Sequence, residues 1–422
     1  MPDASSELSG GRRRAALAFI FVTVTIDILS FGVIIPVLPH LIQSFVGGDI
    51  ASAVAWTGVF GTVFALVQFL CTPLQGALSD RFGRRPVILL SNFGLGIDFL
   101  FMAVANTLPL LFIGRVISGM TAASFSTANA YIADVTAPDK RAQAYGMLGA
   151  AFGIGFIIGP ALGGTLSHFD LRAPFYVSAA LALANFCYGW FVLPESLPPE
   201  KRTAKLELKR ANPLGSLLLL RRYPQVFGLA AVVLLSQFAH YVLPSTFVLY
   251  ADYRYHWGAD SVGYVLALVG LCNAIVQAVL IGKIVPKLGE RKTLLIGLAF
   301  GALGFATQGF ATTGPLSLLA VPLLALWGLA GPSTQALMTR QVDPHEQGRL
   351  QGAIASLVSL AGIAAPAIFT QVFALFIRDQ GGVQLPGASF LLAALLLLAG
   401  FALAWRVTKR PAITHAAQTE GA

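Results

Sequence analysis

Runs of about twenty apolar residues recur along nearly the whole chain, and this pattern constrains the fold more than any other feature. A helix of that length crosses the hydrocarbon core of a bilayer, and the short polar or proline-containing breaks between runs allow turns. Hydrophobic residues make up 56% of the 422 residues and charged residues only 11%, whereas about a quarter of a soluble domain is charged. The sequence therefore predicts an all-α integral membrane protein.

We expect about twelve spans, in two groups of six, on either side of one long polar segment. The segment is rich in lysine and arginine, which is typical of a cytoplasmic linker. The expected domains are therefore a six-helix bundle at 1–193, a linker at 194–224 and a second six-helix bundle at 225–422. The expected spans are Ala15–Ile42, Val54–Leu78, Pro86–Ala105, Leu108–Tyr131, Ala144–Leu166, Pro174–Leu193, Val226–Tyr250, Val262–Ile281, Thr293–Phe310, Leu316–Leu337, Leu350–Phe376 and Ser389–Ala404.

The lysines and arginines also predict the orientation, because they favour cytoplasmic loops. With the N-terminus in the cytoplasm, Arg172, Arg254 and Arg378 lie outside and Arg115 lies within the membrane. The other 24 of the 28 lysines and arginines then lie on the cytoplasmic side. We expect a multi-pass protein of the inner (plasma) membrane with both termini in the cytoplasm. The net charge of +9 needs no nucleic-acid partner, since orientation and lipid contact explain it.

Glycines and prolines at the breaks repeat at one constant separation. Gly76 and Gly83 are matched by Gly282 and Gly289, each 206 residues later. Six such matches indicate a duplicated six-helix unit, an architecture in which the substrate lies near the midplane between two halves. The remaining pairs are Pro109 with Pro315, Pro138 with Pro344, Gly146 with Gly352, and Pro160 with Pro366.

Three motifs stand out against this background. The loop GALSDRFGRRP resembles the signature loop between the second and third helices of the major facilitator superfamily. The resemblance implies a cytoplasmic gate that locks the two halves together in the outward-open state, with the residues Gly76, Asp80, Arg81, Gly83, Arg84 and Arg85. The segment GIGFIIGPALGG resembles the motif of proton-coupled drug antiporters, and its small residues and proline allow close helix packing at Gly153, Gly159, Pro160, Gly163 and Gly164. A generic packing face is the alternative. GRVISG resembles the buried-arginine motif of the same superfamily.

Over nearly the full chain the sequence resembles the tetracycline-resistance exporters of this superfamily. The likeness rests on DILSFGVIIPVLPHL, SDRFGRRPVILLS, GIDFL, GRVISG, LGAAFGIGFIIGPALGG and GLCNAIVQA followed by GERK. It implies proton-coupled export of a small amphiphilic drug. Two positions depart from the exporters: Asn273 replaces a histidine in the eighth span, and Gly301 replaces an aspartate in the ninth. Neither Asn273 nor Gly301 can exchange a proton.

Asp27, Asp98 and Arg115 are the candidate proton-coupling residues. An ionised side chain at membrane depth costs several kcal/mol, about 2.5–3.5 on insertion scales, so such residues are functional candidates by default. All three match functional charges of the exporters, whereas the second half has Val233, Gly304 and Val321 at the repeat-related positions. We expect Asp27 or Asp98 to carry the proton and Arg115 to hold the unprotonated carboxylate or to attract an anionic group. A purely structural bridge between aspartate and arginine is the alternative.

Polar side chains on otherwise apolar spans mark the expected substrate cavity. Asn129 and Gln335 are related by the repeat, which predicts symmetric positions across the cavity. His240 is a possible substitute for the missing histidine. Each of these side chains has a plain alternative role in bonding a neighbouring helix. The expected cavity residues are Gln68, Asn129, Gln237, His240, Asn273, Gln277 and Gln335.

No metal-ligand spacing, phosphate-binding loop or Ser/His/Asp constellation stands out in the sequence. We therefore expect no cofactor, no metal site and no enzymatic activity, with energy drawn from an ion or solute gradient. The expected partners are a small-molecule substrate, protons and membrane lipid, and one chain is expected to function as a monomer. Two other functions remain open: a uniporter or symporter for a sugar or other metabolite, and a transporter-like receptor without net flux.

Overall fold

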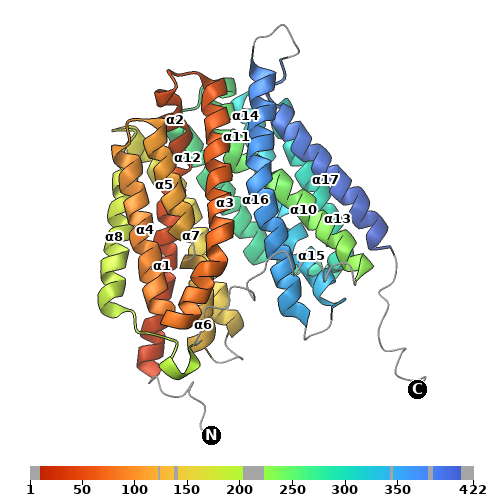
Figure 1. Ribbon diagram of the computed structural model, residues 1–422. Helices are drawn as coiled ribbons and strands as arrows, with labels where there is room; N and C mark the ends of the chain where they lie inside the picture. Colours follow the sequence, from red (N-terminus) through yellow and green to blue (C-terminus); the bar gives the residue numbers. More distant parts are fainter. Residues whose placement is uncertain are drawn as a thin grey trace, which may run out of the picture.

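The computed structural model describes residues 10–121, 124–136, 141–202, 223–342, 346–378 and 384–409. Almost all of these residues are helical, and none of them lies in a β-strand (Figure 1). The predicted all-α membrane fold is confirmed. Most of the expected linker, 203–222, lies outside the described residues, as do Pro138 and Pro344 of the repeat.

The first half consists of eight α-helices that bend or break within the predicted spans. The first span divides at Pro36 and Pro39, because proline cannot donate a backbone hydrogen bond within a helix. The helices are α1 (Gly10–Ile34), α2 (Leu38–Phe45), α3 (Ile50–Phe82), α4 (Arg84–Val104), α5 (Leu108–Thr121), α6 (Ser124–Val135), α7 (Arg141–Ser167) and α8 (Ala173–Val192).

The second half repeats this plan. A short 3₁₀ turn, η3 (Pro199–Lys201), follows α8, and the helices of the second half begin at Pro224. They are α10 (Pro224–His240), α11 (Val242–Tyr255), α12 (Ala259–Ile275), the π-helical turn η6 (Val276–Leu280), α13 (Ile281–Phe310), α14 (Gly314–Trp327), α15 (Ala330–Thr339), α16 (Gln347–Ile377) and α17 (Ala388–Val407).

These helices provide twelve crossings. Ten continuous helical stretches are long and apolar enough to span a bilayer. One of them, Ala259–Phe310, has 52 residues and would extend about 78 Å, more than twice the hydrocarbon thickness. Gly289, with φ 75° and ψ 160°, interrupts it, so it crosses twice. The remaining crossing is the shorter apolar helix α5 together with α6.

Gly83 and Gly289 occupy equivalent turns in the two halves. Gly83 has φ 107° between α3 and α4, and Gly289 has a positive φ at the matching position 206 residues later. An L-residue with a side chain rarely adopts this conformation, so glycine is required at both turns. The repeat in the sequence therefore corresponds to a repeat in backbone geometry.

Two helix pairs join the halves. In Figure 1, α3 and α16 run side by side at the centre of the molecule, and α7 packs against α12. The 206-residue repeat relates α3 to the α12 crossing and α7 to α16, so each interface is the counterpart of the other. This pairing is the one expected for two six-helix bundles about a pseudo-two-fold axis.

The halves also meet through polar side chains on the side of the molecule away from the ends of the chain, which we call the far side (Figure 1). His168 Nε2 lies 3.1 Å from Asp260 Oδ2, and Thr165 Oγ1 lies 3.2 Å from the hydroxyl of Tyr264. His40 Nδ1 lies 4.0 Å from an Asp252 carboxylate oxygen. These contacts connect α7 with α12 and α2 with α11.

Asp49 begins α3 on the far side and caps it. Its carboxylate accepts a 2.9 Å hydrogen bond from the backbone N–H of Ser52. This bond, with a smaller contribution from the positive charge of Arg378 in the second half, lowers the pKa of Asp49 from its usual value. The electrostatic attraction to Arg378 adds to the contacts between halves on this side.

Candidate functional site

A large cavity lies between the two halves. It has a volume of about 1500 Å³, and α1 to α5 and α7 line it from the first half. Helices α10 to α16 and the turn η6 line it from the second. Such a volume exceeds the roughly 300–1,000 Å³ of ordinary ligand sites, so a drug-sized molecule fits with room for water.

Six of the seven predicted cavity residues line this space: Gln68, Gln237, His240, Asn273, Gln277 and Gln335. The exception is Asn129 on α6, which does not belong to the cavity wall. The predicted symmetric placement of Asn129 and Gln335 across the cavity is therefore absent. The imidazole of His240 is exposed to the cavity, and its ring centre lies 5.7 Å from that of Trp327.

Asp98 and Arg115 form a buried ion pair at the cavity wall. Arg115 Nη2 donates a 2.6 Å hydrogen bond to Asp98 Oδ2, and Asp98 is fully buried. Arg115 lines the cavity, lies 5.6 Å from the ring centre of Phe64, and also contacts the sulfur of Met102 at 3.3 Å. The carboxylate is thus connected to the cavity through the guanidinium, so a change in its charge alters a side chain that the substrate meets.

Asp27 lies on α1 and is hydrogen-bonded to α8. The side-chain amide of Asn185 donates to Asp27 Oδ1 at 3.4 Å and to the carbonyl of Thr23 at 3.3 Å. Asp27 is 8% exposed and does not line the cavity. The hydrogen bonds of Asn185 to Thr23 and Asp27 join α1 to α8, whereas the ion pair of Asp98 and Arg115 joins α4 to α5.

The small residues of α7 pack mainly against α1. A Cβ added at Gly159 would lie 2.7 Å from the carbonyl oxygen of Leu29, and one at Gly163 would collide with the backbone of Val33. Such close backbone approach is what small residues permit in membrane helices. Gly153 differs, because an added Cβ there would meet no atom within 4 Å and the residue lines the cavity.

Gly164 and the backbone carbonyl of Pro160 face α12 instead, whereas the ring of Pro160 lies against Gly32 of α1. A Cβ at Gly164 would lie 2.8 Å from the carbonyl oxygen of Ala259 and 2.9 Å from Cα of Asp260. The carbonyl of Pro160 occupies the space where a Cβ at Gly263 would project. This part of α7 therefore closes the far side by direct backbone contact between the halves.

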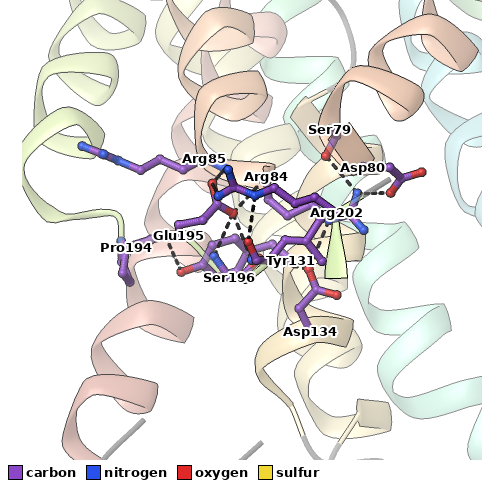
Figure 2. Close-up of polar contacts among 11 residues, drawn as sticks. Ser79, Asp80, Arg84, Arg85, Tyr131, Asp134, Pro194, Glu195, Ser196 and Arg202 are labelled. Carbon is purple, nitrogen blue, oxygen red and sulfur yellow. Dashed lines mark hydrogen bonds and ion pairs between the residues drawn. The ribbon is translucent and has the colours of Figure 1, made fainter. Parts of the chain in front are cut away.

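Arg84 organises the predicted gating loop (Figure 2). Its guanidinium donates to Asp80 Oδ1 at 2.6 Å, to the hydroxyl of Ser79 at 3.0 Å and to Asp134 Oδ2 at 3.1 Å. These bonds connect α3, α4 and α6, which all belong to the first half. In this arrangement, with the far side closed, the loop charges are bonded within one half.

The other predicted gating residues lie around this network. An added Cβ at Gly76 would meet no atom within 4 Å. Arg81 lies over the ring of Phe82 at 5.2 Å from its centre, and Arg85 donates to the carbonyl of Trp190 at 2.6 Å. Gly83 provides the turn itself.

Glu195, which the sequence analysis did not single out, caps α4 at the same loop. Its carboxylate accepts from the backbone N–H groups of Arg84 at 2.8 Å and Arg85 at 3.3 Å (Figure 2). It also accepts from the N–H groups of Ser196 and Leu197. A carboxylate at a helix N-terminus is favourable, and here it ties the segment after α8 to the gating loop.

A Glu195→Gln variant is expected to lower the free energy of unfolding by about 1–3 kcal/mol, because hydrogen bonds to a charged group lose their ionic component. The matched control is Glu200→Gln, which changes an exposed carboxylate five residues later. Denaturation midpoints in detergent measure the difference. Equal midpoints for the two variants would show that the cap contributes nothing.

An Asp260→Asn variant is expected to weaken closure of the far side. A partly exposed polar contact contributes at most about 1 kcal/mol, so the equilibrium between closed and open arrangements should shift less than about fivefold toward open. Distances between spin labels on the far-side ends of α7 and α12 report the shift. The control is Asp170→Asn, because Asp170 accepts from the N–H of Arg172 within the first half. A shift of the same size in the control would refute a role for the His168 contact.

The sequence analysis did not predict several residues that make polar contacts between helices, and the reasons are physical. Asn185 was detectable only as an isolated amide in an apolar span, and its partner depends on how α8 is rotated. His40, His168 and Asp260 lie at the ends of helices, where a sequence pattern gives no information about contacts across halves.

The comparisons with known proteins agree with this architecture. A model of the Major Facilitator Superfamily matches residues 20–366, and the chain belongs to this superfamily. It is similar to the tetracycline resistance protein, class C, of Escherichia coli, with 38% identity over 381 residues, 90% of this chain and 95% of that protein. It is also 36% identical to the class G tetracycline resistance protein of Vibrio anguillarum, over 91% of this chain and 97% of that protein.

Among solved structures, a bacterial homologue of the human lysosomal transporter Spinster, in an inward-facing and occupied conformation, superposes with a TM-score of 0.77. The match covers 95% of this chain and 98% of that chain at 17% identity, which supports the fold alone. The family assignment and the helical spans together make this a multi-pass membrane protein of a transporter superfamily.

Proposed function

We propose that this protein is a proton-coupled exporter of amphiphilic small molecules of the tetracycline type, working by alternating access. The observation that carries the proposal is the buried ion pair of Asp98 and Arg115 at the wall of a cavity of about 1500 Å³ between two halves. The similarity to tetracycline resistance proteins over about nine-tenths of the chain supports the drug class.

The ion pair provides a means of exchanging a proton for the substrate. Burial favours a neutral carboxylic acid, whereas an adjacent arginine favours the carboxylate, so a carboxyl group subject to both influences is poised to change state. A proton on Asp98 weakens its bond to Arg115 and frees the guanidinium to move. A substrate that contacts Arg115 in its paired position is then released as the proton binds, which gives antiport.

Asp27 is proposed as a second proton site on the route through the first half. Its contact with Asn185 joins α1 to α8, so a change in its charge would alter how these helices pack. His240 faces the cavity and is proposed as a substitute for the histidine that Asn273 replaces.

The gating loop is proposed to lock the two halves on the cytoplasmic side when the far side opens. Its charged side chains would then give up their bonds to partners in the first half and form bonds to partners in the second half. We further propose that both termini and the linker lie in the cytoplasm, that the membrane is the inner (plasma) membrane, that residues 1–193 and 225–422 are the two moving bundles, and that one chain suffices for transport.

Drug accumulation in a tetracycline-sensitive bacterium tests the proposed function. Cells that express the protein should accumulate less tetracycline than cells that express Asp98→Asn, and a protonophore should remove the difference. Export that persists after the protonophore would contradict proton coupling, because another gradient would then have to drive it. Equal accumulation in cells with and without the protein would favour a receptor.

A further inference from the structure

Three polar side chains are buried inside the first six-helix bundle, where α1, α4 and α8 pack together (Figure 1). They are Thr23 on α1, Asn92 on α4 and Asn185 on α8, and we call them the polar layer. Each is at most 1% exposed, and none belongs to the wall of the cavity between the halves. The hydroxyl of Thr23 donates to Oδ1 of Asn185 at 3.2 Å. The layer is therefore enclosed within one half of the protein.

The packing of the three helices places the polar layer at one depth. A Cβ added at Gly189 of α8 would lie 2.9 Å from Cδ2 of Leu89 on α4 and 3.0 Å from Cζ of Phe19 on α1. The three helices thus converge at Gly189. One turn further toward the far side, each of them contributes its member of the polar layer.

Asn92 is the member of the layer that has no bonds to explain its burial. Its side chain is fully buried, and neither its amide nitrogen nor its carbonyl oxygen has a hydrogen-bond partner among the residues that the structure describes. The next residue, Phe93, has its ring centre 5.3 Å from that of Phe186, which follows Asn185. A buried carboxamide at this position is unfavourable unless a small polar molecule satisfies it.

The polar groups continue along α1 past Asp27. The amide of Asn185 donates to the carbonyl of Thr23 and to the carboxylate of Asp27, one turn further along. Ser30 follows, fully buried, and its carbonyl accepts from the hydroxyl of Ser178 at 3.2 Å. The hydroxyl of Ser30 has no partner of its own within the described ranges. From Thr23 to Ser30 the polar groups extend about 10 Å along the helix, on both sides of Asp27.

The second half shows that the fold does not require this polarity. The 206-residue repeat places Leu298 at the position of Asn92, and Leu298 is fully buried in the hydrophobic core. The counterpart of α8 is α17, which has no polar side chain from Phe390 to Ala404. Apolar residues therefore hold the equivalent helices together, so the polar layer serves another purpose than packing.

We propose that Thr23, Asp27, Asn92 and Asn185 enclose a binding site for internal water, and that this water carries the proton to and from Asp27. A buried water molecule bonds about three polar groups, and hydroxyl, amide and carboxylate groups from three helices supply them here. When the acid form of Asp27 gives its proton to the water, a carboxylate and a hydronium ion result, and the hydronium ion passes a proton on. This inference rests on the proposed function and adds a proton carrier for an aspartate that does not line the cavity.

Infrared difference spectra of the full-length protein between acidic and alkaline buffer test the proposal. Internal water gives an O–H stretching band that shifts in oxygen-18 water, and the wild type should show this band. Asn92→Leu should lose it, because the larger apolar side chain removes the amide and takes the space of the water. Substrate-driven proton movement in liposomes should fall at least about tenfold in this variant, as expected when a group that positions a proton transfer is lost.

Two other measurements on Asn92→Leu separate the loss of the water from general damage. The dissociation constant for tetracycline should stay at the wild-type value, because Asn92 does not line the cavity. The thermal midpoint in detergent should stay equal or rise, because an amide without hydrogen bonds is replaced by the residue that the second half has at this position.

Ser91→Ala is the matched control on the same helix. Ser91 is also buried, and its hydroxyl also has no hydrogen-bond partner in the described part of the chain. It lies three and seven residues before Gly94 and Asp98, which contact α5, and therefore on the face of α4 toward α5. This variant should keep both the water band and the wild-type proton movement.

The nearly isosteric Thr23→Val takes the place of Asn92→Leu if that variant does not fold, and it should weaken the band and slow proton movement. A wild-type spectrum without the band would overturn the proposal. So would undiminished proton movement in either folded variant, or the same loss in Ser91→Ala. A band that depends on Asn92, in a protein whose substrate moves no protons, would instead contradict the proposed function and leave the water site in place.

Discussion

An Asp98→Asn variant is expected to lose substrate-driven proton movement completely. The substitution leaves the charge of Arg115 buried without its partner, which also costs about 3–5 kcal/mol of stability. Proton movement in liposomes and the thermal midpoint in detergent measure the two effects separately. Loss of transport by this variant alone would not distinguish a coupling role from a structural one.

The double variant Asp98→Asn with Arg115→Gln makes that distinction. It removes both charges, so the cost of burying one charge without its partner is absent. We expect the midpoint to recover while proton movement stays absent. A double variant that recovers both stability and proton-coupled transport would mean that the pair only orients α4 and α5.

A Gly164→Ala variant is expected to reduce transport by at least about tenfold by preventing closure of the far side. The added Cβ would meet the backbone of Ala259 and Asp260 at 2.8 and 2.9 Å, and backbone atoms in packed helices cannot move aside independently. The α7 and α12 helices must therefore separate. Spin labels on the far-side ends of the two helices should report a longer distance than in the wild type.

Gly153→Ala is the matched control on the same helix. Replacing glycine by alanine raises helix propensity by about 1 kcal/mol at either position. At Gly153, however, the added Cβ would enter open space. We expect this variant to keep the wild-type distance between labels. An increase of the same size in both variants would mean that the effect does not depend on contact between the halves.

The sequence predicted the spans because each crossing must supply its own run of apolar residues. It also predicted the duplication, since the turns at Gly83 and Gly289 both require a positive φ and so retain glycine at matching positions. The sequence did not predict where a helix breaks within one span. The break between α14 and α15, for example, lies at Gly328 and Leu329, inside one apolar run.

The candidate site was predicted in composition but not in arrangement. Hydropathy does not determine how a helix is rotated about its axis. Asn129 was therefore expected in the cavity and lies elsewhere, whereas Gly153 was expected in a packing face and lines the cavity. For the same reason the sequence left open which aspartate Arg115 would hold, and the packed helices pair it with Asp98.

The most direct measurement of proton-coupled exchange is the pH change that a substrate gradient drives across liposomes containing the purified protein. With tetracycline on one side and no imposed pH gradient, we predict proton movement opposite to the drug in the wild type. We predict none in Asp98→Asn or in its double variant with Arg115→Gln. Drug flux through the wild type without any pH change would contradict antiport, and the protein would then be a facilitator.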